Sequence, residues 1–110
     1  MDINESDWKV FRRLRELALE RYCQRAIEDV RRAVETKNRG YHERYLRLWK
    51  LLRKHDKTIA IAFDEPRRSR AVIQLANIDA EELLTQEELK QFSEELQEQL
   101  ETIREIRNRN

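Results

Sequence analysis

Residues 8–34 read WKVFRRLRELALERYCQRAIEDVRRAV, and this stretch decides the fold. Apolar side chains recur in it at intervals of three and four residues, which places them along one face of an α-helix. Asn4 and Ser6 precede the stretch and are residue types that cap helix N-termini. We therefore predict a helix over residues 6–38. Its inward face should consist of Trp8, Phe11, Leu14, Ala18, Tyr22, Ala26, Val30, Ala33 and Val34.

The predicted helix is long for the size of the chain. At 1.5 Å per residue, about thirty residues span roughly 45 Å. A compact domain of 110 residues has a radius of gyration of about 13 Å. The helix should therefore bend or extend beyond the rest of the domain. Gly40 is expected to end it in the left-handed conformation that glycine adopts readily.

A second helix is predicted over residues 41–63. A run at residues 58–63 alternates like a β-strand, but a lone strand would have no partner, so we prefer the helical interpretation. Asp56 lies on the apolar face and should pair with an arginine of the first helix, because a buried carboxylate requires a partner. Intervals of four and three residues predict that the inward face consists of Tyr45, Trp49, Leu52, Asp56, Ile59 and Phe63.

Pro66 predicts a short third helix over residues 66–77. Proline favours the first turn of a helix, where its missing amide hydrogen is not needed. The residues expected to face inward are Ala71, Leu75 and Ile78, and those expected to face outward are Arg67, Arg68 and Arg70.

Two capping boxes, in which an N-cap side chain and a residue three positions later satisfy each other's backbone amides, mark further helix starts. Residues 79–82 (DAEE) are the weaker match and should open a single turn. Residues 85–88 (TQEE) match fully and should open a helix over residues 86–107. The apolar seam of that helix reads Leu89, Phe92, Leu96, Gln99, Ile103 and Ile106.

The composition favours the same all-α fold. The chain contains one glycine and one proline, too few for the many turns of a β-sandwich or a doubly wound sheet. Charged residues make up 41% of the chain, against about 25% in ordinary domains, which suits long helices with wide solvated faces. We predict a single domain over residues 1–110, an antiparallel helical bundle of three long helices and one short one.

Positive and negative charges are distributed unequally along the chain. Residues 1–70 hold 19 lysines and arginines and 12 aspartates and glutamates, a net charge of +7. Residues 71–110 hold 4 and 10, a net charge of −6. Because such charges attract each other, the acidic helix at residues 86–107 is expected to face the basic part, within the chain or across a dimer.

The sequence indicates a cytoplasmic protein. Its single cysteine, Cys23, excludes an intramolecular disulfide. The first residues are acidic and contain no apolar run, unlike a signal peptide. No stretch approaches the roughly 18 apolar residues of a membrane span, so we expect no membrane partner.

Four short segments resemble those of a group of short bacterial helical proteins without assigned activity. They are WKVF at residues 8–11, LALERYC at 17–23, AFD at 62–64 and RRS at 67–69. The resemblance implies a bacterial origin and a cytoplasmic setting. It brings no catalytic residues with it.

The residue types needed for catalysis or metal binding do not form a recognisable pattern. His42 and His55 are 13 positions apart, whereas two metal ligands on a helix lie three or four apart. A structural role for His55 and Asp56 is favoured over a functional pocket around them. Cys23 is expected to be a small buried hydrophobic residue rather than a nucleophile. We therefore predict no enzyme, no catalytic residue, no metal and no cofactor.

Two functions are compatible with these patterns. The first is a non-enzymatic interaction protein that forms a homodimer and also has a possible protein partner. Its dimer seam would consist of Leu89, Phe92, Leu96, Ile103 and Ile106. The alternative is a nucleic-acid-binding regulator in which the acidic C-terminal helix masks a basic face. The residues of that face, which could equally bind a protein partner, would be Arg12, Arg13, Arg31, Arg32, Arg44, Arg47, Arg53, Arg67, Arg68 and Arg70.

Overall fold

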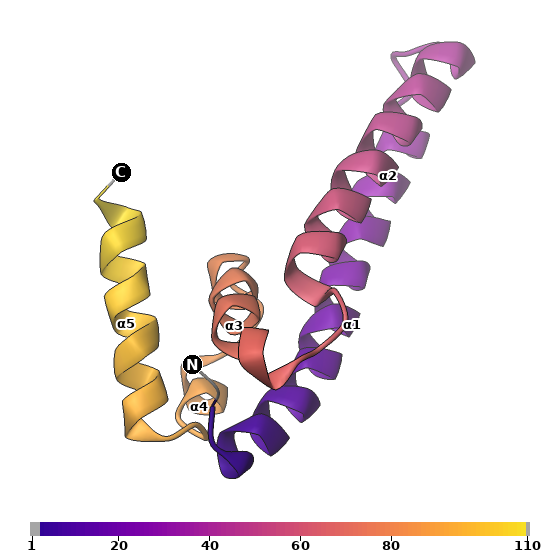
Figure 1. Ribbon diagram of the computed structural model, residues 1–110. Coiled ribbons are helices and arrows are strands. Elements are labelled where there is room, and N and C mark those ends of the chain that lie inside the picture. Colours follow the sequence, from indigo (N-terminus) through magenta and orange to yellow (C-terminus); the bar gives the residue numbers. More distant parts are fainter. Residues whose placement is uncertain (1–2, 110) are drawn as a thin grey trace.

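A computed structural model describes residues 3–109 of the chain. All secondary structure in these residues is helical, which confirms the all-α prediction. The first three α-helices pack against one another, and α5 packs on α3 (Figure 1). The elements are α1 (Glu5–Glu35), α2 (Tyr41–Phe63), the 3₁₀ helix η1 (Arg68–Arg70), α3 (Ala71–Ala80), α4 (Gln86–Leu89) and α5 (Glu94–Asn108).

The first helix begins as predicted and ends slightly earlier. Asn4 is its N-cap, and the Asn4 side chain accepts a hydrogen bond of 2.7 Å from the amide of Asp7. The helix ends where Thr36 adopts an extended conformation. Gly40 does not end it in a left-handed conformation; its φ of −67° is ordinary for any residue, and it serves as the N-cap of α2. The guanidinium of Arg44 instead binds the last carbonyls of this region, those of Val34 and Arg39.

The bounds of α2 are as predicted, and Ile59 and Phe63 of the predicted inward face pack in the core. Over the rest of the helix the inward face is shifted by one residue. His55 and Ala62 are buried against α1, whereas Tyr45 and Trp49 are 57% and 53% exposed. Asp56 is also exposed and pairs with no arginine of α1 among the described residues. Two neighbouring seams have the same spacing, so periodicity alone does not choose between them, and the more apolar of the two is not the one that packs on α1 along most of the helix. The residues of the true inward seam are Arg44, Leu48, Leu51, His55, Thr58 and Ala62.

The third helix starts and ends later than residues 66–77. Arg67 is extended, a 3₁₀ turn follows, and α3 begins at Ala71. The side chain of Gln74 donates hydrogen bonds to the carbonyls of Asp64 and Glu65, which holds the segment before Pro66 outside the helix. The inward positions Ala71, Leu75 and Ile78 are buried as predicted.

The capping box at residues 79–82 is absent, whereas the one at 85–88 is present. Asp79 lies inside α3 and is 8% exposed. Its carboxylate accepts two hydrogen bonds from Arg104, which satisfy it in this buried position. Thr85 and Glu88 make both reciprocal bonds of a capping box at the start of α4.

The predicted helix over residues 86–107 is two helices. It breaks after Leu89, and Ser93 caps α5 by accepting a hydrogen bond from the amide of Leu96. The break is stabilised from outside, because the amide and the hydroxyl of Ser93 both donate to the Asp7 carboxylate, at 2.7 and 2.6 Å. The acidic helix α5 therefore lies against α3, not against the basic face of α2.

Burial divides the molecule into a head and an arm. The head consists of residues 3–22 and 55–109 and holds nearly all of the core, with Phe11, Leu75 and Ile78 the largest fully buried side chains. The arm consists of residues 23–54, the distal halves of α1 and α2, and Ala33 is its one buried residue. The arm extends well beyond the head in Figure 1. The molecule measures 52 × 29 × 23 Å, with a radius of gyration of 16.8 Å, so the long first helix does extend beyond the rest.

Candidate partner-binding surface

The side of α2 that faces away from α1 presents a basic and apolar surface, which we call the α2 outer face. It lies there because the seam through His55 packs on α1, so residues about half a turn away point into solvent. Leu46, Lys50, Arg53 and Lys57 follow one another along this side at intervals of four, three and four residues. The face consists of Leu46, Arg47, Trp49, Lys50, Arg53, Lys54 and Lys57.

The positive charge of this face is not neutralised within the protein. All five of its lysines and arginines are exposed, and none forms an ion pair within residues 3–109. On α1, by contrast, Arg21, Arg31 and Arg32 each pair with a carboxylate. Exposed charges that have no partner in the protein are available to a partner of opposite charge. Lys50 and Lys57 were not among the predicted surface residues, because no pattern in the sequence distinguishes them from the other basic residues of the chain.

Apolar side chains interrupt the basic residues. Leu46 is 46% and Trp49 53% exposed, and together with Lys50 and Arg53 they line a shallow cavity of about 480 Å³. A second cavity of about 400 Å³ follows along the helix, lined by Lys50, Arg53, Lys54, Lys57 and Thr58. The indole nitrogen of Trp49 donates to the hydroxyl of Tyr45 at 3.1 Å, which fixes the ring on the surface. Large exposed apolar side chains beside charged ones are typical of protein-binding surfaces.

The structure separates the arginines of the predicted binding face into several places. Arg47 and Arg53 lie on the α2 outer face. Arg31, Arg32 and Arg44 lie elsewhere on the arm and are occupied by carboxylates or helix-end carbonyls. In the head, Arg12 lies over the Trp8 ring and Arg13 donates to Gln91. Arg67 pairs with Glu65, Arg68 pairs with Glu5, and Arg70 is exposed.

A cavity of about 600 Å³ in the head gathers four of the basic residues of α1. It is lined by Lys9, Arg12, Arg13, Arg15, Glu16 and Pro66. Its charge is partly neutralised, because Arg15 pairs with Glu16 at 2.9 Å and also donates to the carbonyl of Phe63. It is therefore a weaker candidate than the α2 outer face.

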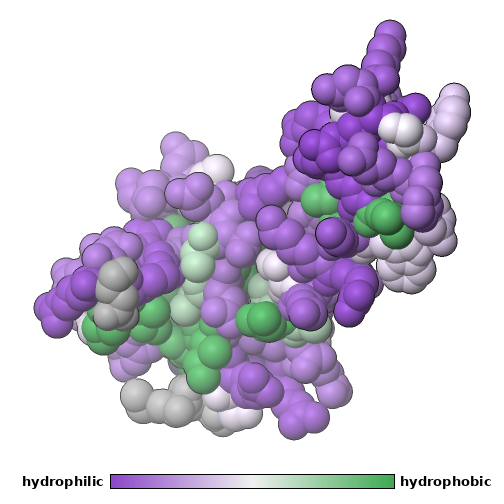
Figure 2. Space-filling view, turned by 90° about the horizontal axis from the view of Figure 1, so that it is seen from above, coloured by the Kyte–Doolittle hydropathy of each residue, from purple (hydrophilic) through white to green (hydrophobic). Residues whose placement is uncertain are grey.

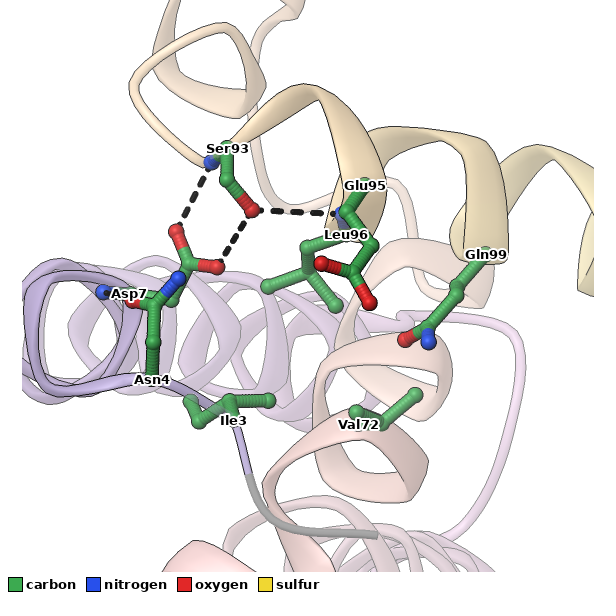
Figure 3. Close-up of a pocket in the computed structure, with 8 residues that line it drawn as sticks. All are labelled: Ile3, Asn4, Asp7, Val72, Ser93, Glu95, Leu96 and Gln99. Atoms are coloured by element: carbon green, nitrogen blue, oxygen red, sulfur yellow. Dashed lines mark hydrogen bonds between the residues drawn. The ribbon is translucent and has the colours of Figure 1, made fainter.

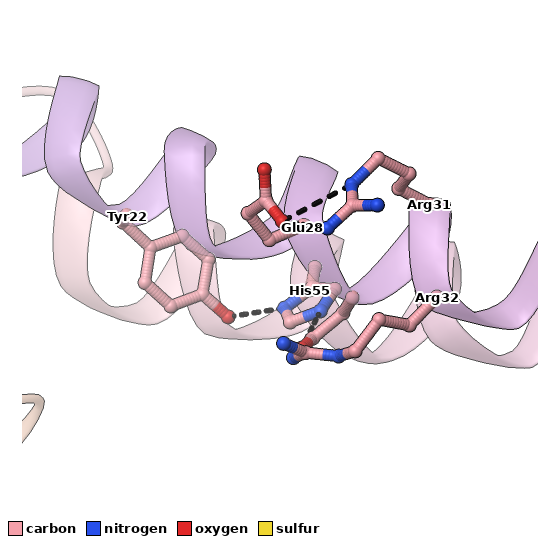
Figure 4. A network of polar contacts seen from close by, with 6 residues as sticks. Tyr22, Glu28, Arg31, Arg32 and His55 are labelled. Carbon is pink, nitrogen blue, oxygen red and sulfur yellow. Dashed lines mark hydrogen bonds and ion pairs between the residues drawn. The ribbon is translucent and has the colours of Figure 1, made fainter.

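His55 forms a buried polar network at the junction of arm and head (Figure 4). Its Nδ1 lies 2.7 Å from the Tyr22 hydroxyl and its Nε2 lies 3.1 Å from Oδ2 of Asp29. Because a carboxylate only accepts hydrogen bonds, Nε2 donates to Asp29, and the Tyr22 hydroxyl, which can donate or accept, bonds Nδ1. Partial burial raises the pKa of Asp29, but hydrogen bonds from Arg32 and His55 outweigh it and hold that pKa below the usual value.

Solvent does not reach the rings of Tyr22 and His55 in this network. Tyr22 is 3% and His55 6% exposed, so a substrate reaches neither ring unless α1 and α2 separate. The sequence predicted a structural role for His55 and Asp56 with Asp56 on the inward side, whereas the structure buries His55 and pairs it with Tyr22 and Asp29. The arrangement joins α1 to α2.

A cavity of about 190 Å³ lies where the N-termini of α1 and α5 meet (Figure 3). Asp7, 3% exposed, is aimed between the two helix starts and accepts both hydrogen bonds from Ser93. A carboxylate at two helix N-termini is favoured by the dipoles of both helices. Its hydrogen-bonding capacity is used within the protein, which makes this site a structural junction.

The residues of the predicted dimer seam lie mostly inside the protomer. Leu89, Phe92 and Leu96 are 5%, 3% and 2% exposed and belong to the core of the head. Ile103 is half-buried and packs against that core. Ile106 is 55% exposed and alone is free to contact a partner.

Beyond these surfaces, the described residues hold few further candidate sites. The described residues contain no group of three histidine, cysteine or acidic side chains that could hold a metal. Cys23 is a half-buried free thiol on α1. None of the described helices is long and apolar enough to cross a membrane.

No family model, curated protein or solved structure matches the chain.

Proposed function

We propose that this protein acts by binding another protein rather than by catalysing a reaction, and that the α2 outer face is its binding surface. The observation that supports this most is the combination of five exposed basic side chains without ion pairs and the exposed Leu46 and Trp49 on one side of the arm. Such a face fits an acidic helical segment with apolar residues along one side.

The arm suits this role because its helices are held by the head and by each other. The Tyr22–His55–Asp29 network fixes the start of the arm, and Arg44 fixes its tip through the carbonyls of Val34 and Arg39. A surface that is rigid before binding loses less entropy when the partner docks. The partner therefore meets Leu46 and Trp49 already in place.

The second candidate function is nucleic-acid binding by the same face. It is favoured by the cavity lined by Lys50, Arg53, Lys54 and Lys57, next to an exposed Trp49. Lysines and arginines bind phosphates, and an exposed indole can stack on an unpaired base. Leu46 separates the two candidates, because a leucine side chain packs against an apolar partner but does not stack on bases.

Two probes test these candidates: a synthetic amphipathic helix of glutamate and leucine, and a single-stranded oligonucleotide of about 20 nucleotides. Fluorescence anisotropy of each labelled probe is measured against the wild type and against K50E/K57E. We expect the variant to bind the peptide at least about tenfold more weakly. The control K37E/K90E makes the same charge change on exposed residues outside the α2 outer face and should bind like the wild type.

The variant L46A then decides between the candidates. Weaker peptide binding by L46A supports the protein-binding role. Oligonucleotide binding that falls steeply with salt and is unaffected by L46A would instead establish the nucleic-acid role. Failure of the wild type to bind either probe near 50 mM salt, where screening is weak, would refute both.

A further inference from the structure

The strongest unused feature of the molecule is a row of carboxylates along α5. Glu94, Glu98, Glu101 and Glu105 follow one another at intervals of four, three and four residues and are all exposed. They lie opposite the side through which Leu96 and Leu100 enter the core. We call this row the α5 acidic face. Glu98 and Glu105 form no hydrogen bond or ion pair through their side chains among the described residues.

The α5 acidic face and the α2 outer face match in spacing. Lys50 and Lys57 are seven residues apart, as are Glu98 and Glu105. Seven residues span about 10.5 Å along a helix, two turns, so both pairs point to the same side of their helices. Two helices laid side by side can therefore bring both pairs of opposite charges together.

The two faces do not meet within one protein molecule. In Figure 1, α5 lies at the left and the arm at the right, with α3 between them, and no ion pair joins α2 to α5 within residues 3–109. α5 is also fixed in place. Arg104 binds Asp79 through two hydrogen bonds of 2.7 and 2.6 Å, and Ser93 binds Asp7.

Apolar surface accompanies each charged row. On α2 it consists of Leu46 and Trp49. Beside α5 a groove of about 410 Å³ lies between α3 and α5, and two of its lining residues are Ile73, 58% exposed, and Ile103. Ile106 extends this apolar strip towards the C-terminus. In Figure 2 hydrophobic atoms gather beside the C-terminal end of α5, whereas the arm at the upper right is mostly hydrophilic.

We propose that the α2 outer face binds the α5 acidic face of a second copy of this chain. The inference rests on the proposed function, because it names the partner of the α2 outer face. The basic row meets the acidic row, and Trp49, which lies to one side of the basic row, packs beside Ile106. The contact joins two different faces of the protein. If each of two molecules binds the other through both faces, a closed dimer forms; if each molecule binds a different neighbour through each face, an open chain of molecules forms.

Charge reversal tests the contact. The variants are K50E/K57E on α2, E98K/E105K on α5, and the quadruple variant that combines them. Light scattering after size-exclusion chromatography gives the molar mass of each at about 100 μM, a range that detects modest affinity, and at about 50 and 300 mM salt. Circular dichroism confirms that each variant is folded.

The expected result is a specific pattern. The wild type self-associates at low salt and dissociates at high salt, because exposed charges are screened. Each double variant is a monomer, since like charges now face each other. The quadruple variant self-associates again, and an equimolar mixture of the two double variants forms hetero-oligomers, because both arrangements restore opposite charges.

Three results would overturn the proposal. They are a wild type that is monomeric at low salt, double variants that associate like the wild type, and a quadruple variant that stays monomeric. The proposed function fails by a different measurement, the loss of peptide binding. A monomeric wild type that still binds the acidic peptide through Lys50 and Lys57 would refute the self-association and leave the binding role intact.

Discussion

In the head, charged side chains join helices that are distant in sequence, whereas in the arm they pair mainly within one helix. Arg104 of α5 binds Asp79 of α3, and Arg21 of α1 binds Glu88 of α4 at 2.7 Å. In the arm, Arg31 binds Glu28 and Glu35, three and four residues away on the same helix. The head is therefore stabilised by tertiary contacts, and the arm by local helix formation and a narrow contact between two helices.

This difference suggests that the head provides the stability of the fold and that the arm provides the surface for binding. The arm has Ala33 as its one buried residue and exposes Tyr45, Leu46, Trp49 and Leu52. A helix pair with so little buried surface contributes little to the folding free energy. Its exposed residues are then free to serve a partner. If head and arm differ in this way, substitutions in the head should lower the free energy of unfolding more than matched substitutions in the arm.

The largest difference is expected for leucine truncation. Leu75 is 1% exposed in the head, so L75A should lower the free energy of unfolding by about 3 kcal/mol, through lost burial and a cavity. Leu51, half-buried in the arm, is the matched control, and L51A should cost about 1 kcal/mol. Urea denaturation followed by circular dichroism measures both. Equal losses would show that the arm is as tightly packed as the head.

The next contrast compares two arginines. R104M leaves the buried carboxylate of Asp79 with one distant partner, Arg107 at 3.9 Å, and should cost about 3 kcal/mol. R31M removes two exposed ion pairs of the arm and should leave the free energy of unfolding nearly unchanged. Thermal denaturation of both variants checks this. The contrast disappears if R31M destabilises the protein as much as R104M.

The third prediction concerns acid. The hydrogen bond from Arg21, together with the amide of Thr85, outweighs the effect of burial and lowers the pKa of Glu88 to about 2. A carboxylate with a lowered pKa stabilises the fold above its ordinary value of 4.5, and this contribution is lost as the pH falls towards 2. We expect E88Q to be about 2 kcal/mol less stable than the wild type near neutral pH.

Unfolding curves measured between neutral pH and the acid range test this. The difference between wild type and E88Q should shrink as the pH falls from about 4.5 to about 2. A difference that stays constant over that range would show that the charge of Glu88 is not what stabilises α4. Glu28 of the arm is the matched case, because its pKa is also lowered by an arginine, Arg31, but the pair is exposed.

The smallest expected effect lies at the junction of arm and head. Y22F removes the hydroxyl that bonds Nδ1 of His55 and leaves a buried ring nitrogen without a partner. The cost should be about 1 kcal/mol. Amide hydrogen exchange should become faster in the arm, residues 23–54, more than in α3 and α5. Uniformly faster exchange would show that the network stabilises the whole protein rather than the attachment of the arm.

Local signals in the sequence were sufficient for most helix ends. Asn4 and Thr85 cap helices as their residue types predict. The bounds of α2 are as predicted, because a helix of this length is strongly periodic. Asp79 was interpreted wrongly as a cap, and Ser93 was not recognised as one, since their roles depend on Arg104 and Asp7, which are 25 and 86 residues away.

The face that α2 presents outward was the main feature that the sequence did not determine. The seam through Tyr45 and Trp49 and the one through Leu48 and Leu51 have the same spacing. The choice between them is made in three dimensions, where the small Ala62 fits against α1 and His55 reaches Tyr22 and Asp29. Two aromatic residues expected in the core, Tyr45 and Trp49, thereby become part of the exposed surface.

The bonds between Asp7 and Ser93 also determine when folding can be completed during synthesis. They join residues 86 positions apart, whereas the contacts of the arm join neighbouring helices across a short turn. Local contacts form early and distant ones late, so α1 and α2 can pair as soon as both have left the ribosome. The core that contains Phe11 and Leu14 also contains Phe92 and Leu96, so it is complete only when these residues emerge. The nascent chain therefore exposes the apolar end of α1 through most of translation, which makes that end the part most exposed to aggregation and to chaperones.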